Sequence, residues 1–237
     1  MTSPPSGWAQ DAVSLAQNAL RALADPERAA PMAAYLRGQF SFLGIPSPAR
    51  TASLRAAWAG QAAPSEGALR DAVVALWALP EREFHYAACD LLARWIGTTK
   101  RAATVSPGFL TGTVQQLITA ASWWDSVDAL RAAATGPLVA AHPELKPVMA
   151  SWVDSDNRWL VRSAIIHQLG YGERTDASLL FAFCARRAAD REFFIAKAIG
   201  WTLRTYARIQ PDEVRGFVAA HPELTSLARR EALKHLG

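Results

Sequence analysis

Near the middle of the chain, residues 122–128 read SWWDSVD and place an indole and a carboxylate four residues apart, at Trp124 and Asp128. In an α-helix, residues at this spacing are neighbours on one face. A π surface beside a negative charge suits a group that becomes cationic during a reaction. The structural alternative is that Trp124 belongs to the core and that Asp128 is solvated or caps the helix. The pair therefore marks a candidate catalytic site if the rest of the chain brings a substrate to it.

A second group of polar residues occupies 154–162, which reads DSDNRWLVR. Arg162 follows Arg158 by four residues and lies on the flank of a helix that is otherwise apolar. An arginine in this position either pairs with an internal carboxylate or faces a bound partner, and the sequence leaves both possibilities open.

A third group combines two cations with an aromatic residue. Lys197, Trp201 and Arg204 follow one another at spacings of four and three residues, so they share one face of a helix. This arrangement suits a nucleic-acid backbone with an aromatic ring against a sugar or base. The alternative is that Trp201 packs inward while the charged side chains extend around it. Tyr35 and Arg50 are further candidates for contacts with such a partner.

The segments that carry these residues have helical periodicity. Apolar residues recur at three and four positions, and no run alternates with a period of two, so we predict an all-α chain without a sheet. Asp25-Pro26 and Ser47-Pro48 each predict an N-cap followed by the first helical residue. The predicted helices cover 8–24, 26–40, 48–59, 65–79, 81–97, 107–121, 124–141, 143–154, 157–170, 175–188, 190–208, 211–220 and 224–236.

An internal repeat predicts how these helices are arranged. The seven residues 139–145, VAAHPEL, return unchanged at 218–224, which is 79 residues later and about two units of ~40 residues. This period is typical of HEAT-like helical pairs. We therefore predict a curved α-solenoid with a concave basic cleft, built as one domain over residues 1–237 with a flexible segment at 1–7.

Composition narrows the class of protein. The chain has 237 residues, 51% of them hydrophobic and 19% charged, which is typical of a globular protein. It contains no apolar run long enough to span a membrane, and its N-terminus lacks the pattern of a signal peptide, so we expect a cytoplasmic protein. The net charge is +4, and 21 of the 25 basic residues are arginine, which binds phosphate well. A GC-rich genome would also produce many arginines.

Cysteine and histidine give no sign of a metal site. The two cysteines, Cys89 and Cys184, lie in apolar helical segments and are expected to be buried free thiols. The five histidines lack metal-binding spacing, so we expect neither a metal nor another cofactor.

Several of these segments together resemble one known family, the AlkD-like DNA glycosylases, which are HEAT-repeat enzymes of DNA alkylation repair. The resemblance covers nearly the whole chain in order. It rests on 42–45, 76–84, 122–128, 155–157 with Trp159-Leu160 and Arg162, 197–201 and 230–232.

The resemblance implies an activity and roles for particular residues. It implies a monofunctional glycosylase that excises positively charged N-alkylated purines, such as 3-methyladenine and 7-methylguanine, from duplex DNA. The family's catalytic aspartate falls on Asp128, its two cleft tryptophans on Trp124 and Trp201, and its DNA-contacting arginine on Arg162. Tyr35, Arg50, Lys197 and Arg204 are further candidates for DNA binding. The expected partner is alkylated double-stranded DNA, bound by a monomer.

The implied chemistry agrees with the residue pattern. An alkylated purine that already carries a positive charge can leave as a neutral base without a general acid, so one carboxylate can suffice where an ordinary glycosidase needs two. Asp128 would stabilise the oxocarbenium-like sugar and orient water, and the two indoles would flank the sugar. The alternative function is a helical-repeat scaffold that binds DNA structure or a protein partner without catalysis.

Overall fold

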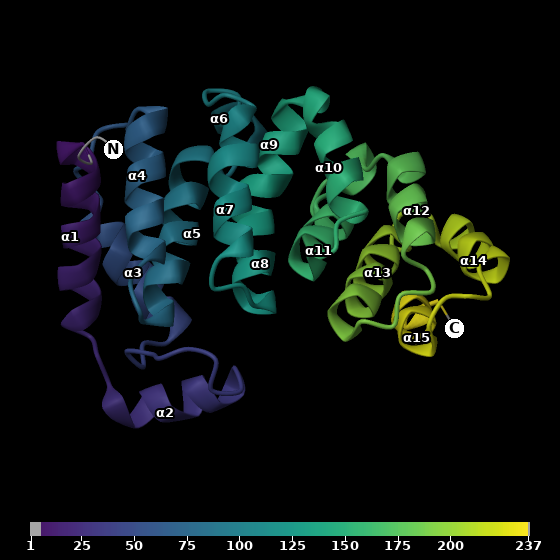
Figure 1. Ribbon diagram of the computed structural model, residues 1–237, viewed down its shortest axis with the longest axis horizontal. Coiled ribbons are helices and arrows are strands. Elements are labelled where there is room, and N and C mark those ends of the chain that lie inside the picture. The colour runs from purple at the N-terminus through teal and green to yellow at the C-terminus, as the bar shows by residue number, and fades with distance from the viewer. Residues whose placement is uncertain (1–5, 237) are drawn as a thin grey trace. The chain divides into compact units, whose positions relative to one another are not determined.

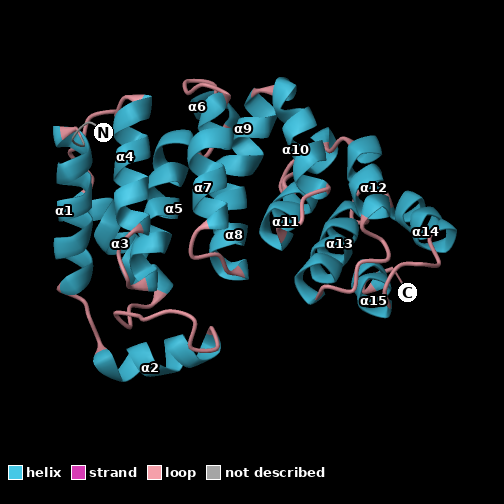
Figure 2. Cartoon of the chain, in the orientation of Figure 1, coloured by secondary structure: helices cyan, strands magenta, loops and turns pink. Residues whose placement is uncertain are grey.

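The computed structural model describes residues 6–236, and the regular structure in this part of the chain is helical (Figure 2). The prediction of an all-α chain is confirmed. Extended pairing within the described residues is limited to an isolated bridge between Ser41 and Glu81. The backbone divides into two compact units, Met1–Thr113 (unit 1) and Val114–Gly237 (unit 2), each of which is described by itself. The curved solenoid with its concave basic cleft, and the single domain, stay predictions.

Unit 1 contains helices that lie side by side and one that lies across their end (Figure 1). Its helices are α1 (Gly7–Arg21), α2 (Pro26–Tyr35), α3 (Ser47–Ala57), α4 (Glu66–Trp77), α5 (Arg82–Ile96) and α6 (Thr99–Ala102), and the π-helical segment η1 (Leu110–Val114) follows them. Helix α1 contacts α3, α4 and α5, whereas α2 buries none of its residues. The loop after α2 is anchored by Glu83, whose buried carboxylate accepts hydrogen bonds from the backbone N–H groups of Leu43, Gly44 and Ile45.

Unit 2 is organised around one buried helix. It contains α7 (Gln115–Thr119), α8 (Trp124–Leu130), η2 (Arg131–Thr135, π-helical), α9 (Gly136–Ala141), η3 (Pro143–Leu145), α10 (Lys146–Val153), α11 (Arg158–Ile166), η4 (Gly172–Arg174), α12 (Ala177–Arg186), α13 (Phe193–Tyr206), α14 (Pro211–Ala220) and α15 (Ser226–Leu233). Every residue of α11 after Arg158 is buried, because this helix contacts α8, α10 and α13. A polar side chain on α11 must therefore find its partners inside the unit.

The seven-residue repeat ends a helix at both sites, although residues 143–145 then form the 3-10 helix η3 and residues 222–224 form a turn. The helices α9 and α14 both end at its third residue, Ala141 and Ala220, and the histidine that follows caps each of them. The backbone N–H of the last repeat residue then donates to the carbonyl of that histidine, at 2.9 Å in the first copy and 3.2 Å in the second. The repeat is thus a signal that ends a helix and starts a turn.

Side-chain hydrogen bonds between neighbouring segments recur at a similar separation in sequence. Many of them join residues 34 to 40 positions apart, which matches the repeat period read from the sequence. Examples are Arg50 with Asp90, Ser106 with Glu66, Arg131 with Leu169, Tyr171 with Gly136, Arg162 with Asp128, Arg158 with Glu192, and Lys197 with Glu231. Each unit is therefore built from consecutive helical segments that are tied to the next at corresponding positions.

The predicted helices are present, but several boundaries differ. The helix predicted at 26–40 ends at Tyr35, because Arg37 and Gly38 turn the backbone with positive φ values of 58° and 69°. The helix predicted at 124–141 is interrupted by the π-helical segment η2. Asp25 caps α2 as predicted, whereas α3 begins at Ser47, which was expected to be the cap.

The predicted flexible segment at 1–7 falls largely outside the described residues. Of this segment, Ser6 accepts a hydrogen bond from the N–H of Ala9 and so caps α1, which begins at Gly7.

Candidate active site

The predicted catalytic carboxylate is held by a buried arginine. Arg162 donates from Nε to Oδ1 of Asp128 and from Nη2 to Oδ2, both at 2.8 Å. The side chain of Arg162 is 6% exposed and that of Asp128 is 19% exposed. Such a bidentate pair fixes the plane and position of the carboxylate. Of the two possibilities that the sequence left open for Arg162, the structure has the internal pair.

Arg162 also connects its own helix to the two helices that carry the predicted catalytic residues. It belongs to α11, its carboxylate partner lies on α8, and its Nη1 donates to the carbonyl oxygen of Phe194 on α13 at 2.7 Å. Trp124 is the first residue of α8. On α13, Trp201 follows Phe194 by seven residues, so Phe194 and Trp201 lie on the same side of that helix. One side chain thus sets the carboxylate relative to the helix of each indole.

Neither predicted indole is sealed in the core. Trp124 and Trp201 are both partly exposed, in contrast to the buried Trp159. The neighbouring Trp123 packs against two other aromatic rings. Its ring centroid lies 5.8 Å from that of Trp159 and 5.4 Å from that of Phe194. This aromatic cluster supports the start of α8, so Trp124 projects from a fixed backbone.

A second guanidinium, which the sequence analysis did not select, lies close to the same carboxylate. Arg131 follows Asp128 by three residues, at the start of the π-helical segment η2. Burial lowers the pKa of Arg131, and the negative charge of Asp128 counters that shift. An arginine one helical turn after a candidate acid is visible in the sequence, and this i, i+3 spacing could have identified it.

The cations predicted on α13 are paired with a carboxylate on α15. Lys197 donates to Oε1 of Glu231 at 2.8 Å, and Arg204 donates to Oε2 of the same residue. The hydrogen bond from Lys197 lowers the pKa of Glu231, and Arg204 adds to this effect. Trp201 lies between the two cations in sequence, so Glu231 holds the side chains that flank this indole. Sequence reasoning did not assign Glu231 a role.

Helix α15 approaches this face closely because α13 carries a glycine there. A Cβ atom placed on Gly200 would lie 2.4 Å from Cβ of Glu231 and 3.0 Å from the carbonyl oxygen of Ala228. A larger residue would push Glu231 away from both of its cationic partners.

The two remaining DNA-binding candidates belong to unit 1. Tyr35 is the last residue of α2 and is 74% exposed. Arg50 has a side chain only 12% exposed, which donates from Nε to Asp90 at 3.3 Å and lies over the ring of Tyr86. Burial raises the pKa of Asp90, although Arg50 opposes that shift. For both residues, contact with DNA stays a prediction.

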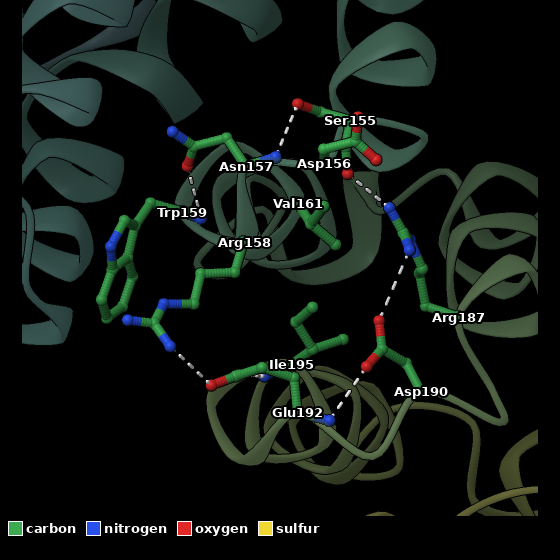
Figure 3. A pocket seen from close by; sticks show the side chains of 10 residues that line it. All are labelled: Ser155, Asp156, Asn157, Arg158, Trp159, Val161, Arg187, Asp190, Glu192 and Ile195. Atoms are coloured by element: carbon green, nitrogen blue, oxygen red, sulfur yellow. Dashed lines mark hydrogen bonds and ion pairs between the residues drawn. The ribbon is translucent and has the colours of Figure 1, made fainter.

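A pocket of about 530 Å³ opens at the N-terminal ends of α11 and α13 (Figure 3). Four of its five charged side chains form two ion pairs: Arg158 with Glu192 at 3.3 Å, and Arg187 with Asp190 at 3.4 Å. The guanidinium of Arg158 also lies 5.1 Å from the ring centroid of Trp159. The described residues that line this pocket do not include Asp128 or either candidate indole, so the pocket is separate from the predicted catalytic group.

Metal binding and membrane insertion find no support in the described residues. Between residues 6 and 236, no three His, Cys, Asp or Glu side chains are grouped so that they could hold a metal ion. The helices in this range are all too short or too polar to cross a membrane. Both cysteines are buried free thiols, as predicted.

The arrangement of α8, α11 and α13 suits electrostatic chemistry. An ionised carboxylate held by two hydrogen bonds can stabilise a nearby positive charge and orient a water molecule. Partly exposed indoles offer π faces that attract cations. These groups are typical of a site that stabilises a cationic transition state.

A family model and a solved structure that are similar to the chain carry the same description. The family model described as DNA alkylation repair enzyme matches residues 16–236. A solved structure described as a predicted DNA alkylation repair enzyme from Enterococcus faecalis is 32% identical, with a TM-score of 0.76, over 90% of this chain and 97% of that chain. No curated protein matches the chain.

Proposed function

The chain belongs to the family of DNA alkylation repair enzymes, and from this membership we propose that it is a monofunctional DNA glycosylase. Its substrates are positively charged N-alkylated purines in duplex DNA, such as 3-methyladenine and 7-methylguanine, and it hydrolyses their N-glycosidic bond. On this proposal the protein acts as a cytoplasmic monomer without a cofactor. The observation that carries the proposal is the carboxylate of Asp128, fixed by Arg162 on the helix that also carries Trp124.

The substrate explains why one carboxylate suffices. Alkylation at N3 or N7 makes the purine a cation, so the base departs as a neutral molecule when the glycosidic bond breaks, and no acid is needed to protonate it. The positive charge then moves to the deoxyribose. A fixed negative charge close to the sugar lowers the energy of this oxocarbenium-like state.

Each residue of the set has a defined role in this mechanism. Asp128 stabilises the sugar cation and orients the attacking water, and Arg162 is the residue that positions its carboxylate. Trp124 and Trp201 present π faces to the sugar. Each ring stabilises a desolvated cation by on the order of 1 kcal/mol. The bond to the base breaks, a water oxygen bonds to the anomeric carbon, and the water proton leaves to solvent or to Asp128.

DNA binding without catalysis is the second candidate function. It is favoured by the fact that both oxygens of Asp128 accept hydrogen bonds from Arg162, which reduces the negative charge that the carboxylate offers to a sugar. A scaffold of this kind would bind duplex DNA and release no base.

Release of 7-methylguanine from methylated duplex DNA, followed by chromatography, separates these functions. We expect release by the wild type, and a rate lower by about 10² to 10³ for Asp128→Asn, because the variant loses the charge that stabilises the transition state. Asp125→Asn is the matched control, since this carboxylate lies on the same helix in its first turn. It should retain a rate close to that of the wild type.

Two results would count against the proposal. If Asp128→Asn, shown to be folded by circular dichroism, released base as fast as the wild type, the carboxylate would have no catalytic role. If borohydride trapped a covalent protein–DNA adduct, the enzyme would use an amine nucleophile and would not be monofunctional.

A further inference from the structure

Arg131 is a partly buried guanidinium whose hydrogen bonds are incomplete. Its Nη1 donates to the carbonyl oxygen of Leu169 at 2.6 Å. Its Nε is buried and has no hydrogen-bond partner. Its Nη2 also has no hydrogen bond within residues 6–236 but is not fully buried, so it is the donor that a partner can reach, and no ion pair of Arg131 is found in this range. A charged group in this state is costly to bury and gains when an anionic oxygen reaches it.

The surroundings of Arg131 hold it in place and leave its side chain only partly buried. The turn after α11 contains Gly170 and Gly172, both with positive φ, at 96° and 60°. Gly170 is exposed, and a Cβ atom added to it would lie 3.8 Å from Nη1 of Arg131. The hydroxyl of Tyr171 donates to the carbonyl oxygen of Gly136 at 2.7 Å and so fixes the turn against the end of η2. The guanidinium therefore lies under a turn that bears no side chain at the nearest position.

The neighbouring Arg162 already has hydrogen-bond partners for its guanidinium nitrogens. Arg162 uses Nε, Nη1 and Nη2 in hydrogen bonds to Asp128 and Phe194, and its side chain is 6% exposed. Arg131 has one such bond and lies one helical turn from the same carboxylate. Of the two guanidinium groups near Asp128, that of Arg131 therefore has the donors with which a negatively charged partner can form hydrogen bonds.

We propose that Arg131 binds a phosphodiester oxygen of the DNA strand on which Asp128 acts. The inference rests on the proposed function for the identity of that strand. Arginine is suited to this contact, because its planar donors match the geometry of phosphate oxygens. The contact adds affinity for the strand beside the carboxylate, and it supplies a partner for the incompletely paired cation at this position.

The salt dependence of DNA binding tests this contact directly. The probe is a duplex with a tetrahydrofuran analogue of an abasic site, and its dissociation constant is measured by fluorescence anisotropy over a range of salt concentrations. Loss of one phosphate contact lowers the slope of log K against log [salt] by about 0.9. We expect this decrease for Arg131→Gln, together with roughly tenfold weaker binding at low salt.

A matched control and a second variant keep the test decisive. Arg215→Gln removes the same charge from an exposed residue of α14 that pairs with Asp212, and it should leave the slope unchanged. Arg131→Lys retains the charge but loses the planar donors, so it should keep the slope and bind a few-fold more weakly. If Arg131→Gln does not fold, the comparison of Arg131→Lys with the wild type decides, and affinity equal to that of the wild type would overturn the proposal.

Failure of this inference is distinguishable from failure of the proposed function. If Arg131→Gln has the slope of the wild type, Arg131 does not bind phosphate, even if the wild type releases base. A lower rate of base release with an unchanged slope would likewise overturn the contact, because Arg131 would then act only through Asp128. If the wild type releases no base, the glycosylase proposal fails, but the slopes still decide whether Arg131 contacts DNA.

Discussion

The ion pair between Asp128 and Arg162 should stabilise the folded protein as well as hold the carboxylate of the candidate site in place. Removing one member of a buried ion pair leaves the other charge without compensation, which typically costs 3–5 kcal/mol. The side chain of Asp128 is 19% exposed, and an asparagine keeps one acceptor oxygen. We therefore expect Asp128→Asn to lower the free energy of unfolding by about 2 kcal/mol.

Arg162→Gln should cost more than Asp128→Asn. It leaves both carboxylate oxygens and the carbonyl oxygen of Phe194 without their donors. We expect a loss of about 3 kcal/mol, and a decrease of roughly 6–12 °C in melting temperature for a chain of this size. The double variant carries neither charge, so its cost should be smaller than the sum of the two single costs by about 2 kcal/mol.

Urea denaturation followed by circular dichroism measures all four proteins of this cycle. Arg158→Gln serves as a control on the same helix, because the pair of Arg158 with Glu192 is more exposed than that of Arg162 with Asp128 and should contribute less than about 1 kcal/mol. Additive single costs would refute the reasoning, since they would mean that the two side chains do not stabilise one another.

Two further predictions concern other parts of unit 2. Gly200→Ala should lower the free energy of unfolding by about 1–3 kcal/mol, because its Cβ would lie 2.4 Å from Cβ of Glu231. Gly216→Ala, on α14 with no atom within 4 Å of the added Cβ, should instead raise it by roughly 0.5–1 kcal/mol, and chemical denaturation of both variants checks the opposite signs. Burial lowers the pKa of His167 from 6.5 to about 4. Between these pH values the unfolded chain binds a proton that the folded chain excludes, so stability is retained above pH 6.5 and falls as the pH decreases, by about 3 kcal/mol in total from this group. Denaturation of the wild type and His167→Phe at several pH values should show a shallower pH dependence for the variant, and equal slopes would contradict the assignment.

The sequence predicted the helices well because their signals are local. Apolar residues at spacings of three and four, and caps such as Asp25, act within one or two turns. The π-helical segment η2 was not predicted, because nothing in the local pattern distinguishes it from a continuous helix. Three of its five residues, Ala133, Ala134 and Thr135, are buried, so packing within the unit contributes to its conformation. The end of the helix predicted at 26–40 was missed because the turn begins at Arg37, a residue type that does not indicate a positive φ, although Gly38 after it is a local signal for the end of a helix.

The candidate site was predicted in part for the same reason. The spacing of Trp124 and Asp128 on one helix is a local property, and the structure confirms that they share α8. The partner of Asp128 lies 34 residues away, and no local pattern connects the two. The repeat period supplies a signal that could have done so, since residues about one period apart meet elsewhere in the chain. Lys197 and Glu231 are also separated by 34 residues.

From the charges around Asp128 we predict that Arg131 affects DNA binding rather than cleavage of the glycosidic bond. One carboxylate lies close to two guanidinium groups, those of Arg162 and Arg131, so the site without DNA has an excess of positive charge that would oppose a sugar cation. A phosphate bound at Arg131 removes this excess before the glycosidic bond breaks. In Arg131→Gln the cation is absent and its contact with the phosphate is lost, so no excess of positive charge remains around Asp128. The variant should therefore bind DNA more weakly, yet under single-turnover conditions with saturating enzyme it should release 7-methylguanine within a few-fold of the wild-type rate. A loss near the 10² to 10³ expected for Asp128→Asn would show that Arg131 acts on the chemical step instead.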